Sequence, residues 1–129
     1  MTEAAQIPGE TYLNLFSNIV PTFGRPPATL VRLFESLAAL PVRERRLIGE
    51  IVLADQNATA LDFTAWLAGK TGRGFRYRVF RDGCCLRRRG TGSIALEHLA
   101  GLRPSVTAAK NTAVGHSRQA WLLFLDDDV

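Results

Sequence analysis

The amino-acid sequence predicts an α/β protein in three layers, with an open, mainly parallel sheet between helices. Apolar runs of strand length alternate along the chain with amphipathic runs of helix length, which is typical of this class. The last run, Trp121-Leu-Leu-Phe-Leu125, has five consecutive apolar residues, as expected of a strand buried on both faces. Three aspartates follow it at positions 126–128. The chain therefore changes abruptly from a predicted core strand to a cluster of carboxylates.

Length and composition point to one globular domain. A chain of 129 residues can bury a core, and 47% hydrophobic with 22% charged residues argues against wholesale disorder. No apolar run reaches the roughly 18 residues that span a bilayer, and the first ten residues lack the basic cluster of a secretion signal. The adjacent Cys84 and Cys85 suit neither an ordinary disulfide nor a zinc site. We therefore expect a cytoplasmic protein, in solution or peripheral at the inner membrane face.

Positive charge is concentrated in the middle of the chain. The net charge is +4, from 16 Lys and Arg against 12 Asp and Glu, and arginines cluster at positions 73–81 and 87–89. Such clusters suit a nucleic acid, a phosphorylated small molecule or an anionic membrane face. Aromatic residues are not interleaved with them in the pattern of a platform that stacks single-stranded bases. We expect no nucleic-acid partner, and interpret the run at 87–89 as a solvated loop.

Proline marks the ends of the first predicted elements. Residues 1–13 are predicted to be a flexible lead-in, and residues 14–129 form the domain. Pro21 ends a strand, and Pro41 stops a helix whose first turn accommodates two prolines. The predicted elements are a strand ending near Val20, a helix from Pro26 to about Leu40, and a strand at 48–54.

The second part of the chain predicts a less regular order. Alternating apolar and basic residues at 75–80 indicate an edge strand with one wet face. Residues 83–104 are predicted to be an irregular insertion. The remaining elements are a helix at 61–68 with a weak capping signal from Thr59 and Asp62, a short helix at 94–100 inside the insertion, a helix capped by Ser105 or Thr107 that runs to about Ser117, and the terminal strand.

Polar residues follow three of the predicted strands, at positions 21–22, 55–57 and 126–128. Parallel strands end at the same edge of a sheet, where open α/β folds bind ligands. We therefore expect the three sets at one rim. Along an extended backbone Asp126 and Asp128 point to one side and Asp127 to the other. The first two can hold Mg²⁺ or Mn²⁺, which favour carboxylates together with substrate phosphates. The alternative is a solvated acidic terminus.

Other motifs are discarded. Gly69-Lys-Thr71 resembles the end of a phosphate-binding loop, but Thr64 stands where the first glycine is required. A dinucleotide-like pattern at residues 90–95 follows three arginines instead of a strand. His98 and His116 have no partner at metal-ligand spacing and are interpreted as packing or surface residues.

Four stretches carry a resemblance to a known family. They are Asn18-Ile-Val-Pro-Thr-Phe-Gly-Arg25, Glu50-Ile-Val-Leu-Ala-Asp55, Ala108-Ala-Lys-Asn-Thr-Ala113 and residues 121–129. In this order they resemble the opening strand and turn, the acidic-ended second strand, the Ala-Ala-Arg-Asn-x-Gly helix and the Asp-x-Asp strand of family-two glycosyltransferases with the GT-A fold. The resemblance covers residues 14–129 and the amino-terminal, nucleotide-binding half of that fold.

The resemblance implies inverting transfer of a sugar from a nucleotide-diphosphate donor, UDP- or dTDP-linked, to an acceptor that it does not identify. Asp55 would accept a hydrogen bond from the base, and Asp127 would contact the ribose. A divalent cation, Mn²⁺ or Mg²⁺, would offset the charge of the leaving diphosphate. The implied nucleotide site consists of Pro21, Thr22, Phe23, Arg25, Asp55, Lys110 and Asp127, and the implied metal site of Asp126 and Asp128.

The sequence departs from the family in three places. Gly24 replaces the usual Asn, and Gln56-Asn57 replaces the common Asn/Asp-Gly-Ser turn. Family members carry their general base beyond the metal motif, so no residue up to position 129 is assigned this role. The chain thus looks truncated after the Asp-x-Asp strand.

Two alternatives stay open at this point. The chain could be a non-catalytic fragment that at most binds nucleotide, whose exposed terminal strand would invite self-association through the sheet edge. A nucleotidyltransferase of related architecture ranks last, because residues 21–27 lack the expected glycine-rich loop.

Overall fold

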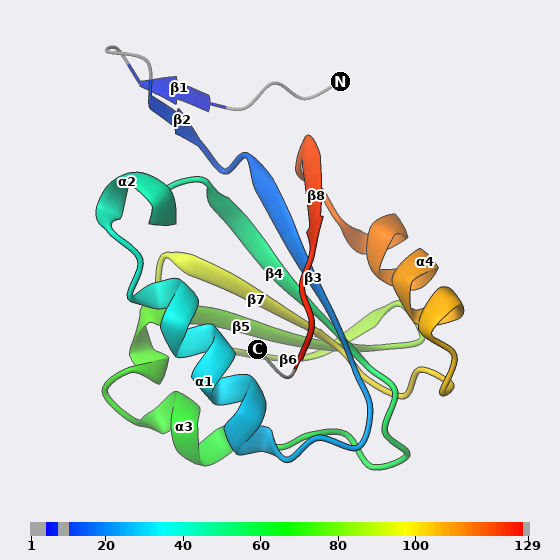
Figure 1. Cartoon of the computed structure of the whole chain (residues 1–129). Helices are drawn as coiled ribbons and strands as arrows, with labels where there is room; N and C mark the ends of the chain where they lie inside the picture. Colours follow the sequence, from blue (N-terminus) through cyan, green and yellow to red (C-terminus); the bar gives the residue numbers. More distant parts are fainter. Residues whose placement is uncertain (1–4, 8–10, 128–129) are drawn as a thin grey trace.

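A computed structural model of the chain describes residues 5–7 and 11–127, with side chains from residue 14 onward. Its centre is a mixed six-stranded sheet in the order β6-β5-β7-β4-β3-β8 (Figure 1). All neighbouring pairs are parallel except β5 and β6, which form an antiparallel hairpin. The strands are β3 (Phe16–Thr22), β4 (Ile48–Asp55), β5 (Phe75–Arg81), β6 (Cys84–Arg89), β7 (Ile94–Leu99) and β8 (Trp121–Phe124).

Helices lie on both faces of the sheet. Figure 1 shows α1 and α3 on one face and α4 on the other, which confirms the predicted three-layer α/β class. The helical elements are α1 (Pro27–Ala38), α2 (Val42–Arg45), α3 (Thr64–Ala68), the 3₁₀ turn η1 (Gly72–Gly74) and α4 (Val106–His116). Within the described residues, no helix is long and apolar enough to cross a membrane.

Local chemistry explains where the two longest helices begin. Pro27 is the first residue of α1, where a missing backbone N–H leaves no hydrogen bond unmade. Ser105 precedes α4, and its hydroxyl accepts a hydrogen bond from the backbone N–H of Ala108 at 3.3 Å. Of the two caps considered for this helix, Ser105 is the one present.

The core has an aromatic side and a side of small residues. Between the sheet and α1 and α3, Phe34, Phe63, Trp66 and Phe75 form a cluster of tilted and edge-to-face rings. On the opposite face α4 uses alanines, which let the helix approach the sheet closely. The buried residues on that face are Ile19, Val52, Ala54, Phe80, Leu99, Ala109 and Ala113.

The prediction of an irregular insertion at residues 83–104 is wrong. It contains two strands, β6 and β7, and the residues predicted to form a short helix at 94–100 form the buried strand β7 between β5 and β4. Glu97 and His98 gave this run a polar pattern that conceals a core strand. Partners on neighbouring strands satisfy both side chains, which is why they are tolerated inside the sheet. The predicted edge strand at 75–80 therefore lies inside the sheet, and β6 is the edge.

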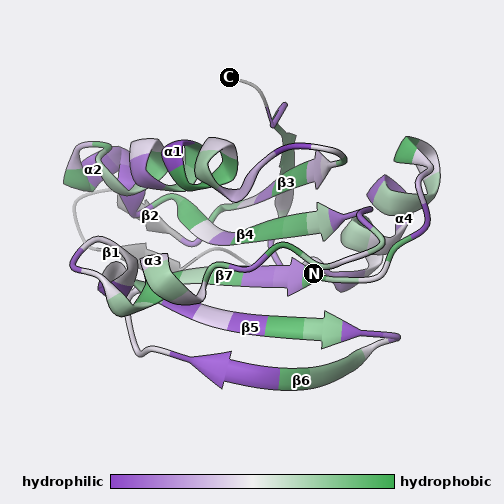
Figure 2. Ribbon diagram, turned by 90° about the horizontal axis from the view of Figure 1, so that it is seen from below, coloured by the Kyte–Doolittle hydropathy of each residue, from purple (hydrophilic) through white to green (hydrophobic). Residues whose placement is uncertain are grey.

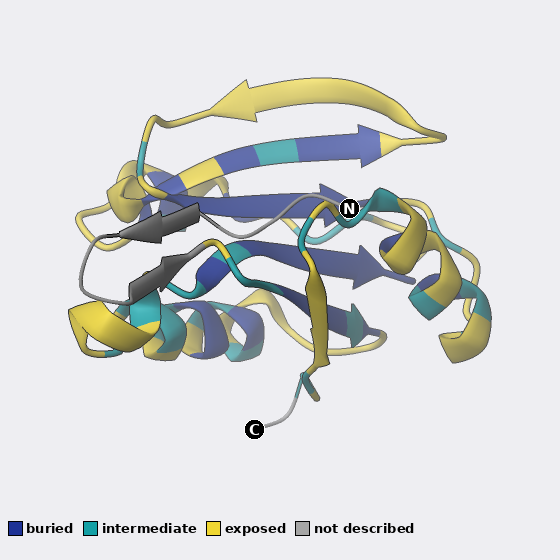
Figure 3. Cartoon of the chain, turned by 90° about the horizontal axis from the view of Figure 1, so that it is seen from above, coloured by how far each residue is buried: buried dark blue, intermediate teal, exposed yellow. Residues whose placement is uncertain are grey.

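The predicted burial of the terminal strand is also wrong. β8 pairs only with β3 within the described residues, and all four of its side chains are exposed, from 39% for Leu122 to 62% for Trp121. Figure 3 shows β8 exposed along its length while β4 and β7 are buried. A consecutive apolar run requires cover on both faces, and position at the edge of the sheet leaves this one uncovered.

The start of the chain also differs from the expectation of a lead-in without structure. β1 (Ala5–Ile7) and β2 (Thr11–Leu13) form a separate antiparallel pair. The remainder of that predicted lead-in, residues 1–4 and 8–10, lies outside the described residues. The first long strand runs from Phe16 through Pro21 to Thr22, two residues past its predicted end near Val20.

Candidate functional site at the carboxyl ends of the strands

The three polar sets predicted to meet at one rim do meet there. The Thr22 hydroxyl, at the end of β3, donates to a carboxylate oxygen of Asp127 at 2.8 Å. The backbone N–H of Gly24 donates to the side-chain oxygen of Asn57 at 2.9 Å. Gln56 donates to the backbone carbonyl of Thr22 at 3.4 Å. Because β3, β4 and β8 are parallel, segments up to 105 residues apart in sequence close one edge of the sheet.

A pocket of about 270 Å³ opens at this rim, between the ends of β3 and β8 and the first half of α4. Six of the nine residues predicted to bind nucleotide or metal line it: Pro21, Phe23, Arg25, Lys110, Asp126 and Asp127. Four further lining residues, Gln56, Val106, Phe124 and Leu125, were not predicted as site residues. Proximity along the chain could have identified them, since each lies within two residues, or one helical turn, of a predicted site residue.

The pocket contains two cations, Arg25 and Lys110, and two carboxylates, Asp126 and Asp127. Arg25 Nε lies 3.4 Å from a carboxylate oxygen of Asp127, and Lys110 Nζ lies 5.3 Å from the centre of the Phe124 ring, within the range of a cation–π contact. Phe23 lines the pocket and is 59% exposed, so part of its side chain is accessible to a ligand. The arrangement suits a ligand with an aromatic ring and negative charge.

The predicted metal site lies only partly within the described residues. Asp126 is exposed at the pocket and Asp127 is held by Thr22 and Arg25, whereas Asp128 lies outside the described residues. In the part of the chain that the structure describes, no group of three or more His, Cys, Asp or Glu side chains could hold a metal ion. One or two carboxylates together with substrate phosphates are enough for Mg²⁺, so the exposed Asp126 fits a cation that arrives with a diphosphate.

Asp55 does not line the pocket. Its side chain is fully buried, and its carboxylate accepts hydrogen bonds from the backbone N–H of Leu61 and from both the backbone and the side chain of Asn57, at 2.7–2.9 Å. Asp55 thereby fixes the loop between β4 and α3. Its predicted contact with a nucleotide base stays a prediction, and the neighbouring Gln56 is the residue of this loop that reaches the pocket.

His98 completes a buried polar chain with Asp55 and Tyr77. His98 Nε2 lies 2.7 Å from Asp55 Oδ2, and His98 Nδ1 lies 2.7 Å from the Tyr77 hydroxyl. Burial alone would raise the pKa of Asp55, but the hydrogen bonds from His98, Leu61 and Asn57 outweigh it, so the pKa is lowered. Burial raises the pKa of Tyr77 to about 12, so the Tyr77 hydroxyl stays protonated at neutral pH and shares a hydrogen bond with His98. His98 is thus a packing residue, as predicted, with partners that the sequence did not identify.

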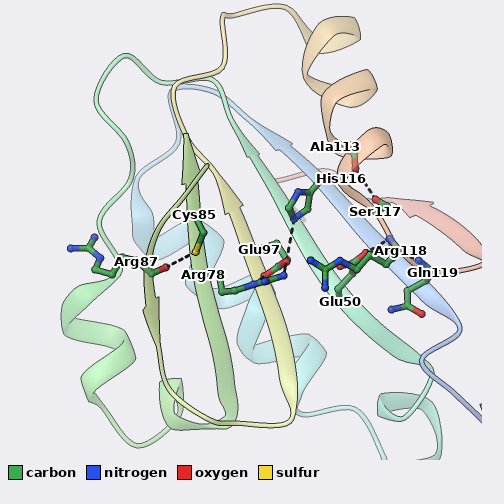
Figure 4. A network of polar contacts seen from close by, with 11 residues as sticks. Glu50, Arg78, Cys85, Arg87, Glu97, Ala113, His116, Ser117, Arg118 and Gln119 are labelled. Atoms are coloured by element: carbon green, nitrogen blue, oxygen red, sulfur yellow. Dashed lines mark hydrogen bonds and ion pairs between the residues drawn. The ribbon is translucent and has the colours of Figure 1, made fainter. Parts of the chain in front are cut away.

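A second hollow, of about 420 Å³, lies on the α4 face at the opposite end of the strands. Its floor holds two buried carboxylates with internal partners (Figure 4). Glu97 accepts from Arg78 and from His116, and Glu50 accepts from the Ser17 hydroxyl at 2.6 Å and the backbone N–H of Arg118 at 2.7 Å. These contacts tie β3, β4, β5, β7 and the end of α4 together, so we interpret the hollow as structural.

The Glu97 carboxylate of this network has a strongly lowered pKa. Burial alone would raise the pKa of Glu97, but the hydrogen bonds from His116 and Arg78 and their positive charges outweigh burial and lower the pKa to about 2. The ionised form of Glu97 is therefore part of the folded structure at neutral pH.

Comparisons of the chain with protein-family models, with curated proteins and with solved structures found no match. The structure by itself defines an α/β protein with a mostly parallel sheet, of the Rossmann-like class, and a polar pocket at the carboxyl ends of β3 and β8.

Proposed function

We propose that this chain binds a nucleoside-diphosphate sugar, UDP- or dTDP-linked, as the donor-binding part of a glycosyltransferase of the GT-A type. The observation that carries the proposal is the pocket at the rim. Residues from the β3 turn, from α4 and from the end of β8, which were selected from sequence by their resemblance to that family, line one cavity. Parallel topology alone would bring the strand ends together, and Arg25 and Lys110 add two cations to the same pocket.

Six of the lining residues have a role in this proposal. Phe23 and Gln56 receive the base, with Phe23 offering a ring face and Gln56 an amide. Lys110 and Arg25 attract the diphosphate, and Asp127 accepts from the ribose hydroxyls. Asp126, together with Asp128, holds a divalent cation, which when bound stabilises the negative charge of the departing diphosphate.

Binding without transfer is the second candidate. Asp126 and Asp127 are the only acidic side chains among the described residues that line the pocket, and the proposal uses both for donor binding. No described carboxylate of the pocket is left to deprotonate an acceptor hydroxyl. This favours a chain that binds the donor and does not by itself catalyse transfer.

Calorimetric titration of UDP, dTDP, ADP and GDP, each with and without MnCl₂, tests the proposal. We expect UDP or dTDP to bind, and Mn²⁺ to strengthen the binding at least about tenfold, a change of about 1.4 kcal/mol. Lys110→Met should weaken binding by a comparable factor, because a charge-assisted contact to phosphate is lost.

The matched control is Lys70→Met, which removes an exposed lysine outside the pocket and should leave binding unchanged. A folded wild-type chain that binds none of the four nucleotides would contradict the proposal. Binding that Lys70→Met weakens as much as Lys110→Met would show general attraction to a basic protein instead. An assay for UDP or free sugar released from a UDP-sugar then distinguishes the two candidates, because a chain that only binds the donor releases neither.

A further inference from the structure

On one side of β8, no other strand of the described residues pairs with the backbone. The backbone N–H of Trp121 donates to the carbonyl of Leu15, just before β3, and that of Leu125 donates to the carbonyl of Ile19 in β3. Hydrogen bonding alternates along a strand of a parallel pair, so the N–H and C=O groups of the intervening Leu122 and Phe124 point away from β3. Such a row of outward groups is a template for another strand.

The side chains of β8 do nothing to discourage such pairing. Edge strands are normally protected by charge, proline, a bulge or a covering element. β8 contains no charged residue and no proline, and its register with β3 is regular, without a bulge, from Trp121 to Phe124. All four side chains are exposed, and three of them are exposed by 45% or more. The strand is therefore both geometrically open and apolar.

Charges at the two ends of β8 have opposite sign. Arg118 precedes the strand and is exposed, whereas Asp126 and Asp127 follow it. A second copy of the same strand placed parallel would bring like charges together at each end. Placed antiparallel, it sets the arginine of one copy beside the aspartates of the other, which is the complementary arrangement.

Two requirements select the same antiparallel register. Outward-pointing residues must face one another, so Leu122 and Phe124 have to pair with each other or each with itself. Maximal apolar contact requires residues 121–125 of both copies to overlap completely. Both conditions hold when the two-fold axis passes through Leu123. Trp121 then faces Leu125 of the second copy, and Leu122 faces Phe124.

We propose that β8 pairs antiparallel with β8 of a second copy of this chain, about a two-fold axis at Leu123, to form one continuous sheet across a dimer. The proposal does not rest on the proposed nucleotide site. A symmetric pair of strands consumes both open edges, so the association closes at two chains.

Sedimentation velocity over a concentration series tests the dimer. The apparent mass of the wild-type protein should rise with concentration from that of one chain, 14.2 kDa, to twice that value, and should not increase further. Leu123→Lys puts two like charges at the axis and should raise the dissociation constant at least about tenfold, because directly opposed like charges destabilise paired strands. Arg118→Glu should weaken the dimer less, and its effect should diminish in high salt.

The matched control is Leu86→Lys, since Leu86 is an apolar residue, 60% exposed, on the edge strand β6. It should dimerise as wild type does, and circular dichroism checks that all variants are folded. Three results would each overturn the proposal: a wild-type chain that stays monomeric at every concentration, association that continues past two copies, or a Leu86→Lys variant that dissociates as readily as Leu123→Lys.

Discussion

The two edge strands of the sheet, β6 and β8, differ in their protection against pairing with another strand. Both are exposed along their length, as Figure 3 shows. β6 ends in three consecutive arginines, which make its second half hydrophilic in Figure 2, and its pairing with β5 contains an irregularity between Val79 and Phe80. Charge and a break in register are two of the devices by which sheets avoid edge-to-edge association. β8 has neither.

The arginine run at 87–89 has a physical role at this edge, which is to protect β6 from pairing with another strand. A solvated loop was predicted, but these residues form part of an edge strand. Their positive charges repel an approaching strand of the same kind, and β6 therefore ends the sheet. The apolar β8 leaves the sheet open to extension at its other side.

Removal of the arginines on β6 should have the largest effect. In a variant with Arg87, Arg88 and Arg89 all replaced by Thr, the strand keeps its β propensity and loses its charge. With both edges open, the chain should form assemblies larger than the wild-type species, measured by sedimentation velocity and by the soluble concentration. Replacement of the same three residues by Lys retains the charge and should behave as wild type. If the threonine variant also behaves as wild type, charge does not protect β6.

The buried ion pair beside β6 should make stability depend on pH. The pKa of Glu97 is lowered to about 2 from an ordinary value of 4.5, so its contribution to stability is fully present above pH 4.5 and is lost as pH falls toward 2. We expect this loss to be on the order of 2 to 3 kcal/mol. Urea unfolding at several pH values measures it.

Glu97→Gln removes the carboxylate and should flatten the acid side of that profile. The variant should also be less stable than wild type at pH 7, because the positive charge of Arg78 loses its opposite charge. Equal slopes for wild type and variant between pH 4.5 and 2 would show that another carboxylate carries the acid sensitivity.

At the β8 side the expected effect is smallest. Thr22→Val keeps the shape of the side chain and removes the hydroxyl that donates to Asp127 just after β8, a loss of about 1 kcal/mol. Amide hydrogen exchange in β8 should become faster, because this bond attaches the end of the edge strand to β3. Thr112→Val is the control, since its hydroxyl bonds only within α4 in the described structure. Unchanged exchange in β8 would indicate that β8 is held by its backbone pairing alone.

Long-range pairing explains where the sequence failed. Residues 94–99 contain Glu97 and His98, and a polar pair at the centre of a run argues locally against a buried strand. Their partners, Arg78 and Asp55, are 19 and 43 residues away, so no local window could reveal that both are satisfied. The open edge at β8 is the opposite case, because apolar character predicts burial only if another part of the chain supplies cover.

The sequence by itself determined the three-layer α/β class, the starts of α1 and α4, and the meeting of three strand ends at one rim. These features depend on periodicity, on capping residues and on the rule that parallel strands end on the same side, all of which are local or topological. Only the tertiary structure decided which strand is central and which is an edge, and that Asp55 is occupied by His98 and its own loop while Gln56 reaches the pocket. Those outcomes depend on which residues become neighbours in space, and burial and hydrogen bonding between distant segments settle them.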